Sequence, residues 1–316
     1  MTARPLLELR ARVRRTIRDL FDARGFVEVD TPVLSREVLP EAHIDPIVVP
    51  LEGEAAPRFL QASPEACMKR LLARGAGSIY QFAAAFRAGE RGRQHDVEFT
   101  ILEWYEPAAT LEAAESLLDE LCRRTLGTRG IERVTCREAF LAHAGVDALT
   151  ATADEMEEAV RRAGQAVPAG AADTMEGERR DRAFELVLAE LVQPRLGRGR
   201  PTMLVDWPAS QAAFARLDPA APDVARRFEL FVKGVELANG WEEEPDRAVL
   251  AARIAEANRI RAAAGRRVLP TPERLLEAHG AAMPSGFGAA LGFDRLVMLA
   301  ADADSIGAVR PFTGEA

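Results

Sequence analysis

A run of charged and aromatic residues at 86–105 has the composition of a polyphosphate clamp. The segment reads FRAGERGRQHDVEFTILEWY, in which one strand-like stretch ends at Arg87 and another begins near Phe99 after an arginine-rich loop. A planar guanidinium suits bidentate contact with phosphate, and an aromatic ring offers a face for a purine. An exposed hairpin with solvated charges is the alternative, and on composition alone it is an equally good interpretation.

Two carboxylates further along the chain could bind a hard cation. The segment FELFVKGVELANG predicts two strands joined by a turn at Lys233-Gly234, so that Glu229 and Glu236 can point to the same face. Adjacent buried carboxylates repel each other and take up protons unless a cation lies between them, and hard oxygen ligands suit Mg²⁺ that bridges phosphates. The alternative is a pair of exposed strand carboxylates, and this signal is weak by itself.

A third segment, GFGAALGFDRLVML at 286–299, combines glycines with an apolar helix. The glycines permit close approach of the backbone to a ligand, and Arg295 lies at a helix start where an anion would bind. The alternatives are glycines that serve tight helix packing and an Asp294 side chain that caps the helix.

The tripeptide Ser63-Pro64-Glu65 predicts a helix start. Serine is a good N-cap, proline is tolerated in the first turn, and an acid there complements the helix dipole. The same acid could instead take a substrate ammonium. Tyr105, by the usual role of a large ring on a strand, could be a core residue.

The elements that must position these residues mix strands with helices, and no internal repeat or linker divides them. An antiparallel sheet with peripheral helices, an α+β fold in one domain over 1–316, fits best. A helix-rich insertion is expected around 131–200. Strands are expected at 26–30, 79–87, 97–105, 201–208 and 226–240, and helices at 5–24, 63–74, 110–126, 246–264 and 293–301.

Composition excludes several classes of protein. The chain has 316 residues, 48% hydrophobic and 28% charged, which is typical of a globular protein. With a formal net charge of −8, the chain lacks the overall basic charge of many nucleic-acid-binding proteins, although an acidic protein can still bind nucleic acid through a local patch. No apolar run approaches about 20 residues, and no signal-peptide segment begins the chain, so we expect a cytoplasmic protein with no membrane association.

Cysteine and lysine usage adds two details. Cys67, Cys122 and Cys136 are odd in number and widely spaced, which argues against a disulfide framework or a zinc site. Lys69 and Lys233 are the only lysines among 41 basic residues. The bias toward arginine hints weakly that a compact ammonium matters in these two segments.

Taken in order, these segments resemble the catalytic core of class II aminoacyl-tRNA synthetases, and within that class the lysine branch. GFVEVDTPVLS is similar to motif 1, the dimer-interface element, and the segments at 86–105 and 286–299 are similar to motifs 2 and 3. KGVELANGWEE resembles the strand of the lysyl enzyme that carries the metal carboxylates. Because the catalytic core begins near residue 5, we expect no anticodon-binding OB domain. A truncated core of this length resembles the ligases that attach lysine or (R)-β-lysine to a lysine side chain of elongation factor P.

The resemblance implies a role for each matching position. Arg87 would hold the α-phosphate of ATP, Arg295 the γ-phosphate, and Phe99 the adenine ring. The other implied nucleotide contacts are Glu90, His95, Asp96, Glu236, Leu237 and Gly292. The implied magnesium ligands are Glu229 and Glu236. In the amino-acid site Glu65 would meet an amine, Tyr105 and Glu243 would read the distal ammonium, and the remaining implied contacts are Ser63, Pro64 and Asn239.

The chain departs from the lysyl pattern in two places. Ala88-Gly89 stands where the pattern has Asn-Glu, so the carboxylate expected near the adenine amine is absent; Glu90 or a backbone carbonyl is the expected substitute. Asp96 stands where the pattern has Asn and places an extra negative charge close to the nucleotide.

The resemblance implies an ATP-dependent, AMP-forming ligase with two half-reactions. Lysine or β-lysine is activated as an acyl-adenylate and then passed to an amine of elongation factor P, with ATP and Mg²⁺ as cofactors, no tRNA partner and a homodimer formed through motif 1. Three other functions stay open: a compact lysyl-tRNA synthetase, a catalytically silent amino-acid- or nucleotide-binding paralogue, and a different amino-acid ligase.

Overall fold

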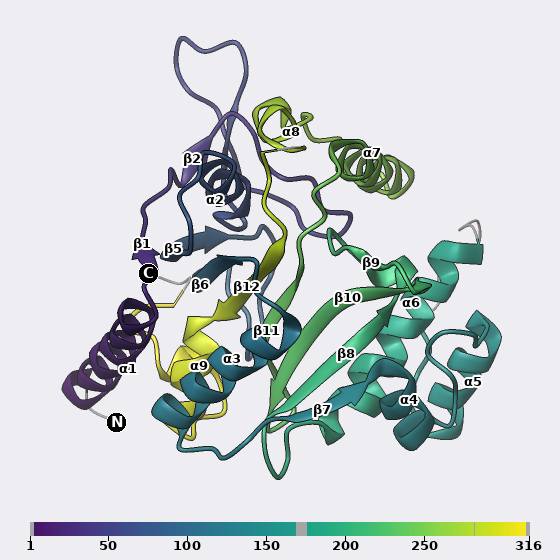
Figure 1. The fold of residues 1–316 in the computed structure, drawn as a ribbon. Helices are drawn as coiled ribbons and strands as arrows, with labels where there is room; N and C mark the ends of the chain where they lie inside the picture. The colour runs from purple at the N-terminus through teal and green to yellow at the C-terminus, as the bar shows by residue number, and fades with distance from the viewer. Residues whose placement is uncertain (1–2, 169–175, 281, 314–316) are drawn as a thin grey trace. The chain divides into compact units, whose positions relative to one another are not determined.

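The computed structural model describes residues 3–168, 176–280 and 282–313 and contains two compact units (Figure 1). Each unit contains both strands and helices, and the organisation into one domain stays a prediction. In the described part of the chain, no helix combines the length and the apolar character needed to cross a membrane. Unit 1 comprises Met1–Ala114, Arg124–Leu126 and Glu243–Ala316, and unit 2 comprises Glu115–Arg123 and Gly127–Glu242.

Antiparallel strands form the frame of unit 1. Strand β6 (Glu98–Pro107) pairs on one side with β5 (Ile79–Phe86) and on the other with β12 (Gly286–Gly292). The short β1 (Val27–Glu28) runs parallel to β5. In this register, Phe86 lies opposite Glu98 and Gly292 opposite Ile101. The last residues of β5 and β12 therefore both lie beside the first residues of β6.

Helix α1 (Ala3–Ala23) packs its apolar face against this frame, as the helical spacing at 5–24 predicts. Ile17 and Phe21 are fully buried, and the Phe21 ring stacks on Tyr80 of β5 at a centroid distance of 4.7 Å. Further along α1, the Arg14 guanidinium lies 4.7 Å from the centroid of the Phe82 ring. Aromatic stacking and cation–π contact add to the burial of apolar area in holding the helix on the strands.

The remaining elements of unit 1 surround the frame. A small sheet in the order β2-β4-β3 consists of β2 (Leu34–Ser35), β4 (Arg58–Leu60) and β3 (Val48–Val49). The helices are α2 (Glu65–Leu72), α7 (Arg247–Ala263), α8 (Glu273–Ala278), α9 (Phe293–Ala300) and the 3-10 turn η4 (Ile306–Ala308). The expected helices at 63–74, 246–264 and 293–301 are confirmed.

Unit 2 is built on the expected hairpin and apolar strand. Strand β10 (Ala221–Val232) pairs antiparallel with β11 (Val235–Glu242) and with β8 (Thr202–Pro208). A short β9 (Leu217–Asp218) also pairs with β10, and β7 (Glu132–Thr135) runs parallel to β8. The turn predicted at Lys233-Gly234 is confirmed, since both residues have positive φ between β10 and β11.

Helices cover these strands, and those between residues 131 and 200 fall in the expected helix-rich insertion. They are α4 (Cys136–Ala144), α5 (Ala153–Arg162), α6 (Glu176–Val187), a π-helical turn η1 (Leu188–Val192) and the 3-10 turns η2 (Gln193–Arg195) and η3 (Ala209–Gln211), while α3 (Leu111–Leu126) precedes β7. Phe184 of α6 stacks on Phe140 of α4 at 4.6 Å and lies 5.8 Å from Trp207 of β8. This buried aromatic group joins the helices to the sheet. Part of the predicted break at 163–172 lies outside the described residues.

Candidate active site

Arg87 follows β5 directly and contacts the aromatic residue predicted to stack on adenine. Its Cζ lies 5.0 Å from the centroid of the Phe99 ring on β6, and its backbone N donates a 2.9 Å hydrogen bond to Val97 O. Glu90 Oε1 lies 3.7 Å from Arg87 Nη1. Among the described residues, the buried Nε of Arg87 has no hydrogen-bond partner. A buried donor without a partner is costly, so this group is prepared to receive an anion.

Arg295 meets the loop of the predicted polyphosphate clamp at the start of α9. Its Nη2 lies 2.7 Å from Nε2 of His95, and its Nε donates to Gln94 O at 3.3 Å. The imidazole can accept this bond only when Nε2 carries no proton. Gly292 lies against the same side chain, because a Cβ there would be 3.3 Å from Arg295 Cδ. Since β5 and β12 both end beside the start of β6, Arg87 and Arg295 flank one end of that strand.

Asp294 does not cap α9. The helix begins after Gly292 at the N-cap position, and the buried Asp294 carboxylate accepts hydrogen bonds from the backbone N of Thr100 at 2.9 Å and from Arg10 Nη1 at 2.7 Å. The capping alternative is therefore wrong, because the side chain points to β6 and α1. Asp294 ties the start of α9 to both elements.

Asp96, the extra negative charge in the clamp loop, has a cation of its own. Its Oδ2 accepts a hydrogen bond from Arg310 Nη1 at 2.5 Å, and its Oδ1 accepts from Val97 N at 2.8 Å. Arg310 Nε also lies 3.9 Å from Asp294 Oδ2. The charge of Asp96 is thus balanced inside unit 1, and its contact with a nucleotide stays a prediction.

The predicted amino-acid residues come together around a buried carboxyl group, that of Glu103. The Ser63 hydroxyl donates to Glu103 Oε2 at 2.6 Å and accepts from Glu65 N at 3.0 Å, while the Tyr105 hydroxyl donates to Glu103 Oε1 at 2.5 Å. Burial raises the pKa of Glu103 to about 8, and repulsion by Glu65 acts in the same direction. Pro64 occupies the N-cap position of α2, so the expected Ser63 cap is replaced by the Ser63 bond to Glu65 N.

The two carboxylates predicted to read the substrate's ammonium groups face one buried lysine. Lys69 Nζ lies 2.7 Å from Glu65 Oε1 and 2.6 Å from Glu243 Oε2. All three side chains are buried. Burial alone would lower the pKa of Lys69, but the attraction of Glu243 and Glu65 outweighs it and raises that pKa above its ordinary value. The ammonium is therefore held in its charged form.

Gly288 leaves room for this group of side chains. It lies opposite Tyr105 in the register of β12 and β6. A Cβ at this position would come within 2.5 Å of the Tyr105 ring and 2.7 Å of Glu243 Oε1. No side chain fits there unless the tyrosine or the glutamate moves.

The predicted metal carboxylates lie in unit 2, on β10 and β11. Arg227 Nη2 donates to Glu229 Oε1 at 2.5 Å, and Arg227 Nε donates to Asn239 Oδ1 at 3.2 Å. The guanidinium lies over Trp207, 4.0 Å from the ring centroid. Asn239, which was predicted to contact the amino acid, lies opposite Glu229 in the strand register. Arg227 therefore holds two of the predicted site residues.

Glu229 and Glu236 have the chemistry of a partial magnesium site. Burial raises the pKa of Glu229 to about 8, Arg227 opposes this, and the negative charges of Glu236 and Glu185 raise it further. A cation would relieve this repulsion. In the described ranges no group of three or more His, Cys, Asp or Glu side chains could hold a metal ion alone. Two carboxylates fit Mg²⁺ that takes its other ligands from phosphate and water.

Four residues that contact the predicted site residues were absent from the sequence-based set. Lys69 gave a weak signal through the rarity of lysine, and Glu103 lies two positions before the predicted Tyr105. Arg227 and Arg310 gave no signal, because one basic residue among many acquires meaning only when the fold supplies its acidic partner. Leu237 is buried on β11, next to Glu236.

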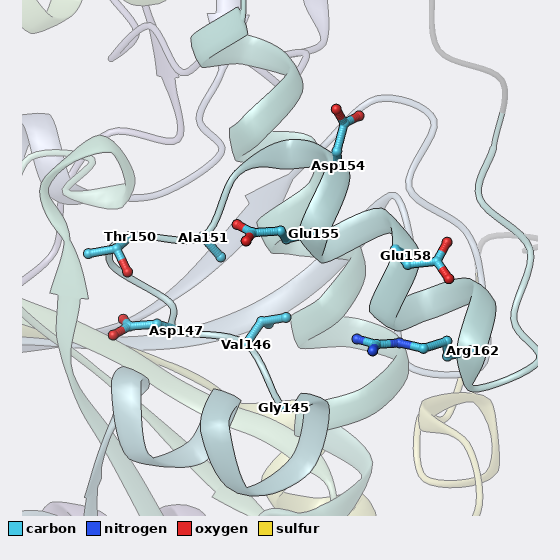
Figure 2. Close-up of a pocket in the computed structure, with 9 residues that line it drawn as sticks. All are labelled: Gly145, Val146, Asp147, Thr150, Ala151, Asp154, Glu155, Glu158 and Arg162. Atoms are coloured by element: carbon cyan, nitrogen blue, oxygen red, sulfur yellow. The ribbon is translucent and has the colours of Figure 1, made fainter.

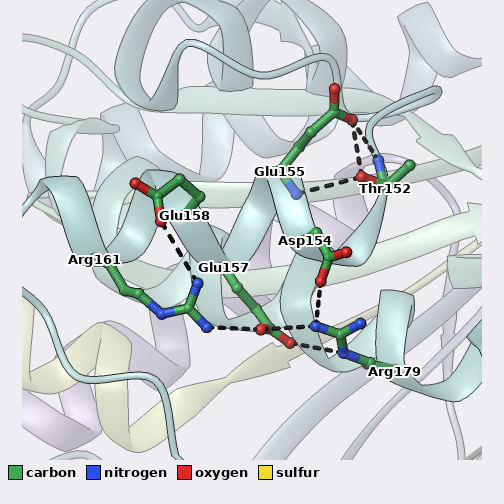
Figure 3. Close-up of polar contacts among 7 residues, drawn as sticks. All are labelled: Thr152, Asp154, Glu155, Glu157, Glu158, Arg161 and Arg179. Atoms are coloured by element: carbon green, nitrogen blue, oxygen red, sulfur yellow. Dashed lines mark hydrogen bonds and ion pairs between the residues drawn. The ribbon is translucent and has the colours of Figure 1, made fainter.

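A pocket of about 640 Å³ in unit 2 is lined by none of the predicted residues (Figure 2). The acidic residues that line it form ion pairs or cap a helix. Asp147 pairs with Arg137 at 2.8 Å, and Glu155 completes the capping box of α5 with Thr152. Figure 3 shows that Asp154 and Glu158 also have arginine partners. These carboxylates stabilise the helices and give the pocket no unsatisfied acid to offer a ligand.

Comparisons with known proteins show which family the chain belongs to. The family model of class II tRNA synthetases (D, K and N) matches residues 2–316. The chain is 38% identical over 313 residues to the elongation factor P–(R)-β-lysine ligase of Salmonella gallinarum (strain 287/91 / NCTC 13346), covering 98% of this chain and 95% of the relative. The enzyme of that name from Enterobacter sp. (strain 638) is 39% identical, over 98% of this chain and 95% of the relative. The one from Edwardsiella ictaluri (strain 93-146) is also 39% identical, over 96% of this chain and 93% of the relative.

The chain therefore belongs to the class II tRNA synthetase family, and the expected α+β fold of that class is confirmed. Within the class, it belongs to the family of the elongation factor P–(R)-β-lysine ligases.

Proposed function

We propose that this chain is an ATP-dependent ligase that activates lysine or (R)-β-lysine and transfers it to a lysine side chain of elongation factor P. The observation that carries the proposal is the buried group of Glu65, Glu103, Tyr105 and Glu243, which offers acidic and hydroxyl groups to a small molecule with two amines. Family membership and the names of the relatives support the reaction.

The first half-reaction joins the amino acid to AMP. The substrate carboxylate attacks the α-phosphorus of ATP in line, the bond to the bridging oxygen breaks, and pyrophosphate leaves. Arg87 would hold the α-phosphate and Arg295 the γ-phosphate, while Phe99 would stack on adenine, because fixed guanidiniums stabilise the charge that develops on the phosphates. Glu229 and Glu236 would hold Mg²⁺, which when bound neutralises phosphate charge.

The second half-reaction transfers the acyl group. A neutral amine of elongation factor P attacks the carbonyl carbon of the adenylate, a new amide forms, and AMP leaves. Glu243 and Tyr105 would hold the distal ammonium throughout. A substrate without that ammonium would lose its charge-assisted hydrogen bond to Glu243, which would lower its affinity relative to a diamino acid.

The first test is ATP–pyrophosphate exchange with purified protein. We expect exchange that depends on lysine or (R)-β-lysine. In Glu243→Gln the kcat/KM for the amino acid should fall at least about 100-fold, because a charge-assisted hydrogen bond is removed. Glu244→Gln, the neighbouring half-exposed position, is the matched control and should behave like the unaltered protein. Absence of exchange with both amino acids would refute the proposal.

Three finer features belong to the same proposal. They are the lack of a tRNA substrate, a homodimer formed through motif 1, and a cytoplasmic location. Charging assays with lysine tRNA test the first, and light scattering tests the second: lysyl-tRNA formation or a purely monomeric protein would contradict the respective feature.

A further inference from the structure

The Lys69 ammonium contacts the same two carboxylates that the proposed function assigns to the amines of the substrate. Its side chain is 2% exposed, and both partner oxygens lie within hydrogen-bonding distance of the one nitrogen. Glu65 is one helical turn away on α2, but Glu243 comes from a distant part of the chain, after β11. The contact therefore joins two segments of unit 1 and is more than a helix surface pair.

The choice of lysine stands out in this chain. Of its 41 basic residues only Lys69 and Lys233 are lysines. An arginine presents a flat fork of donors that favours a single carboxylate, whereas an ammonium is compact and directs its donors to three sides. A compact cation can bridge two carboxylates that approach from different elements.

The groups around Lys69 carry more negative than positive charge. Glu65 and Glu243 contribute two negative charges and Lys69 one positive charge, while Glu103 is neutral near pH 7 because its pKa is raised to about 8. Two further titratable groups add no charge: Tyr105, a neutral phenol beside Glu103, Glu65 and Glu243, and His279, whose pKa is lowered by burial and by Lys69. The charges of these groups add up to −1.

A diamino acid with one carboxylate has a net charge of +1, so it would neutralise this pocket. Without Lys69 the pocket would have two uncompensated carboxylates, and a buried, uncompensated carboxylate either destabilises the fold or takes up a proton. A protonated glutamic acid no longer attracts an ammonium. The lysine thus keeps the two glutamates in the form in which they can bind amines.

We propose that Lys69 is a positioning and specificity-determining residue, whose ammonium holds Glu65 and Glu243 ionised and oriented and fixes the pocket charge that a diamino acid neutralises. The inference rests on the proposed function, since it takes both glutamates as the readers of the substrate's amines.

The first experiment measures ATP–pyrophosphate exchange for Lys69→Met, Lys69→Arg and Lys233→Met. We expect Lys69→Met to raise the KM for lysine and β-lysine at least about tenfold and to leave the KM for ATP within twofold. Lys69→Arg keeps the charge and should keep the preference for diamino acids over leucine. Lys233→Met removes the exposed lysine of the β10–β11 turn and is the matched control. An unchanged amino-acid KM in Lys69→Met would overturn the inference and leave the proposed function intact.

A second measurement needs no variant at Lys69 to fold. With ¹³C,¹⁵N-lysine labelling, a chain with two lysines gives only two sets of lysine side-chain NMR signals, and Lys233→Met assigns them. We expect unlabelled lysine to shift the Lys69 signal at saturation while the Lys233 signal stays in place. If the Lys69 signal does not move although the protein catalyses ATP–pyrophosphate exchange, the inference about Lys69 is refuted and the proposed function is not. Failure of the unaltered protein to catalyse exchange would refute the proposed function, and this inference with it.

Discussion

At the scale of single residues, the acidic groups of unit 1 are satisfied in two different ways. Glu65 and Glu243 both form ion pairs with the Lys69 ammonium, whereas Glu103 accepts hydrogen bonds from hydroxyl groups such as that of Tyr105. An ion pair keeps a carboxylate charged, and burial without a cation favours the neutral acid. Two charged carboxylates and one neutral acid therefore belong to the same pocket, and the proposed function assigns the charged ones to the substrate's amines.

The neutral acid makes stability depend on pH. Because the pKa of Glu103 is about 8 in the folded protein and near its ordinary value of 4.5 when unfolded, the unfolded chain loses this proton first as the pH rises. The contribution of Glu103 to the free energy of unfolding should fall between about pH 4.5 and 8, by at most about 1.4 kcal/mol per pH unit. Urea unfolding of the unaltered protein and Glu103→Gln at pH 5, 6, 7 and 8 measures it. Parallel curves for the two proteins would contradict this assignment.

Gly288 and Gly292 offer a matched pair of substitutions on β12. Gly288→Ala places a methyl group within 2.7 Å of Tyr105 and Glu243, so we expect the KM for the amino acid to rise about tenfold or more. Gly292→Ala meets only the flexible Arg295 side chain at 3.3 Å, so the amino-acid KM should stay unchanged. Steady-state exchange kinetics of both variants test this. Equal effects on the amino-acid KM would count against the position of the pocket.

At the scale of elements, the C-terminal turn η4 holds the loop of the polyphosphate clamp. Ile306 N donates to Arg93 O at 2.9 Å, and Arg310 pairs with Asp96. A loop that is pinned by a turn and an ion pair loses less freedom when it closes on phosphates, so its ordering costs less on binding. Arg310 is therefore expected to act on nucleotide affinity through Asp96.

Removing Arg310 tests this connection. Arg310→Ala leaves Asp96 buried without its cation, so we expect a loss of about 3 kcal/mol in the free energy of unfolding and a several-fold rise in the KM for ATP. The KM for the amino acid should not change. The double variant Arg310→Met with Asp96→Asn removes both charges and should recover most of the stability. A stability loss with an unchanged KM for ATP would show that the contact is structural only.

Sequence patterns predicted the elements better than the contacts between them. The spacing at 5–24 gave α1, and the alternation on both sides of the clamp loop gave β5 and β6, because period and turn residues are local properties. Asp294 was open to interpretation as a cap, because its partner Thr100 is far away in sequence. The sequence did not predict Glu103, Arg227 and Arg310 for the same reason, because their roles depend on partners that only folding brings close.

At the scale of the whole molecule, the chain matches its relatives over nearly their full length, and its formal net charge is −8. The match to the family covers residues 2–316, which includes both units. The residues proposed to act in the reaction occur in both units: the arginines and the amino-acid pocket belong to unit 1, and the proposed magnesium carboxylates belong to unit 2.

The most direct test of the account is mass spectrometry of elongation factor P after incubation with this protein, ATP, Mg²⁺ and either lysine or (R)-β-lysine. We predict the addition of one lysyl or β-lysyl group to a single lysine of the factor, dependent on ATP and lost with Glu243→Gln. An unmodified factor in every reaction, from protein that binds ATP, would contradict the account.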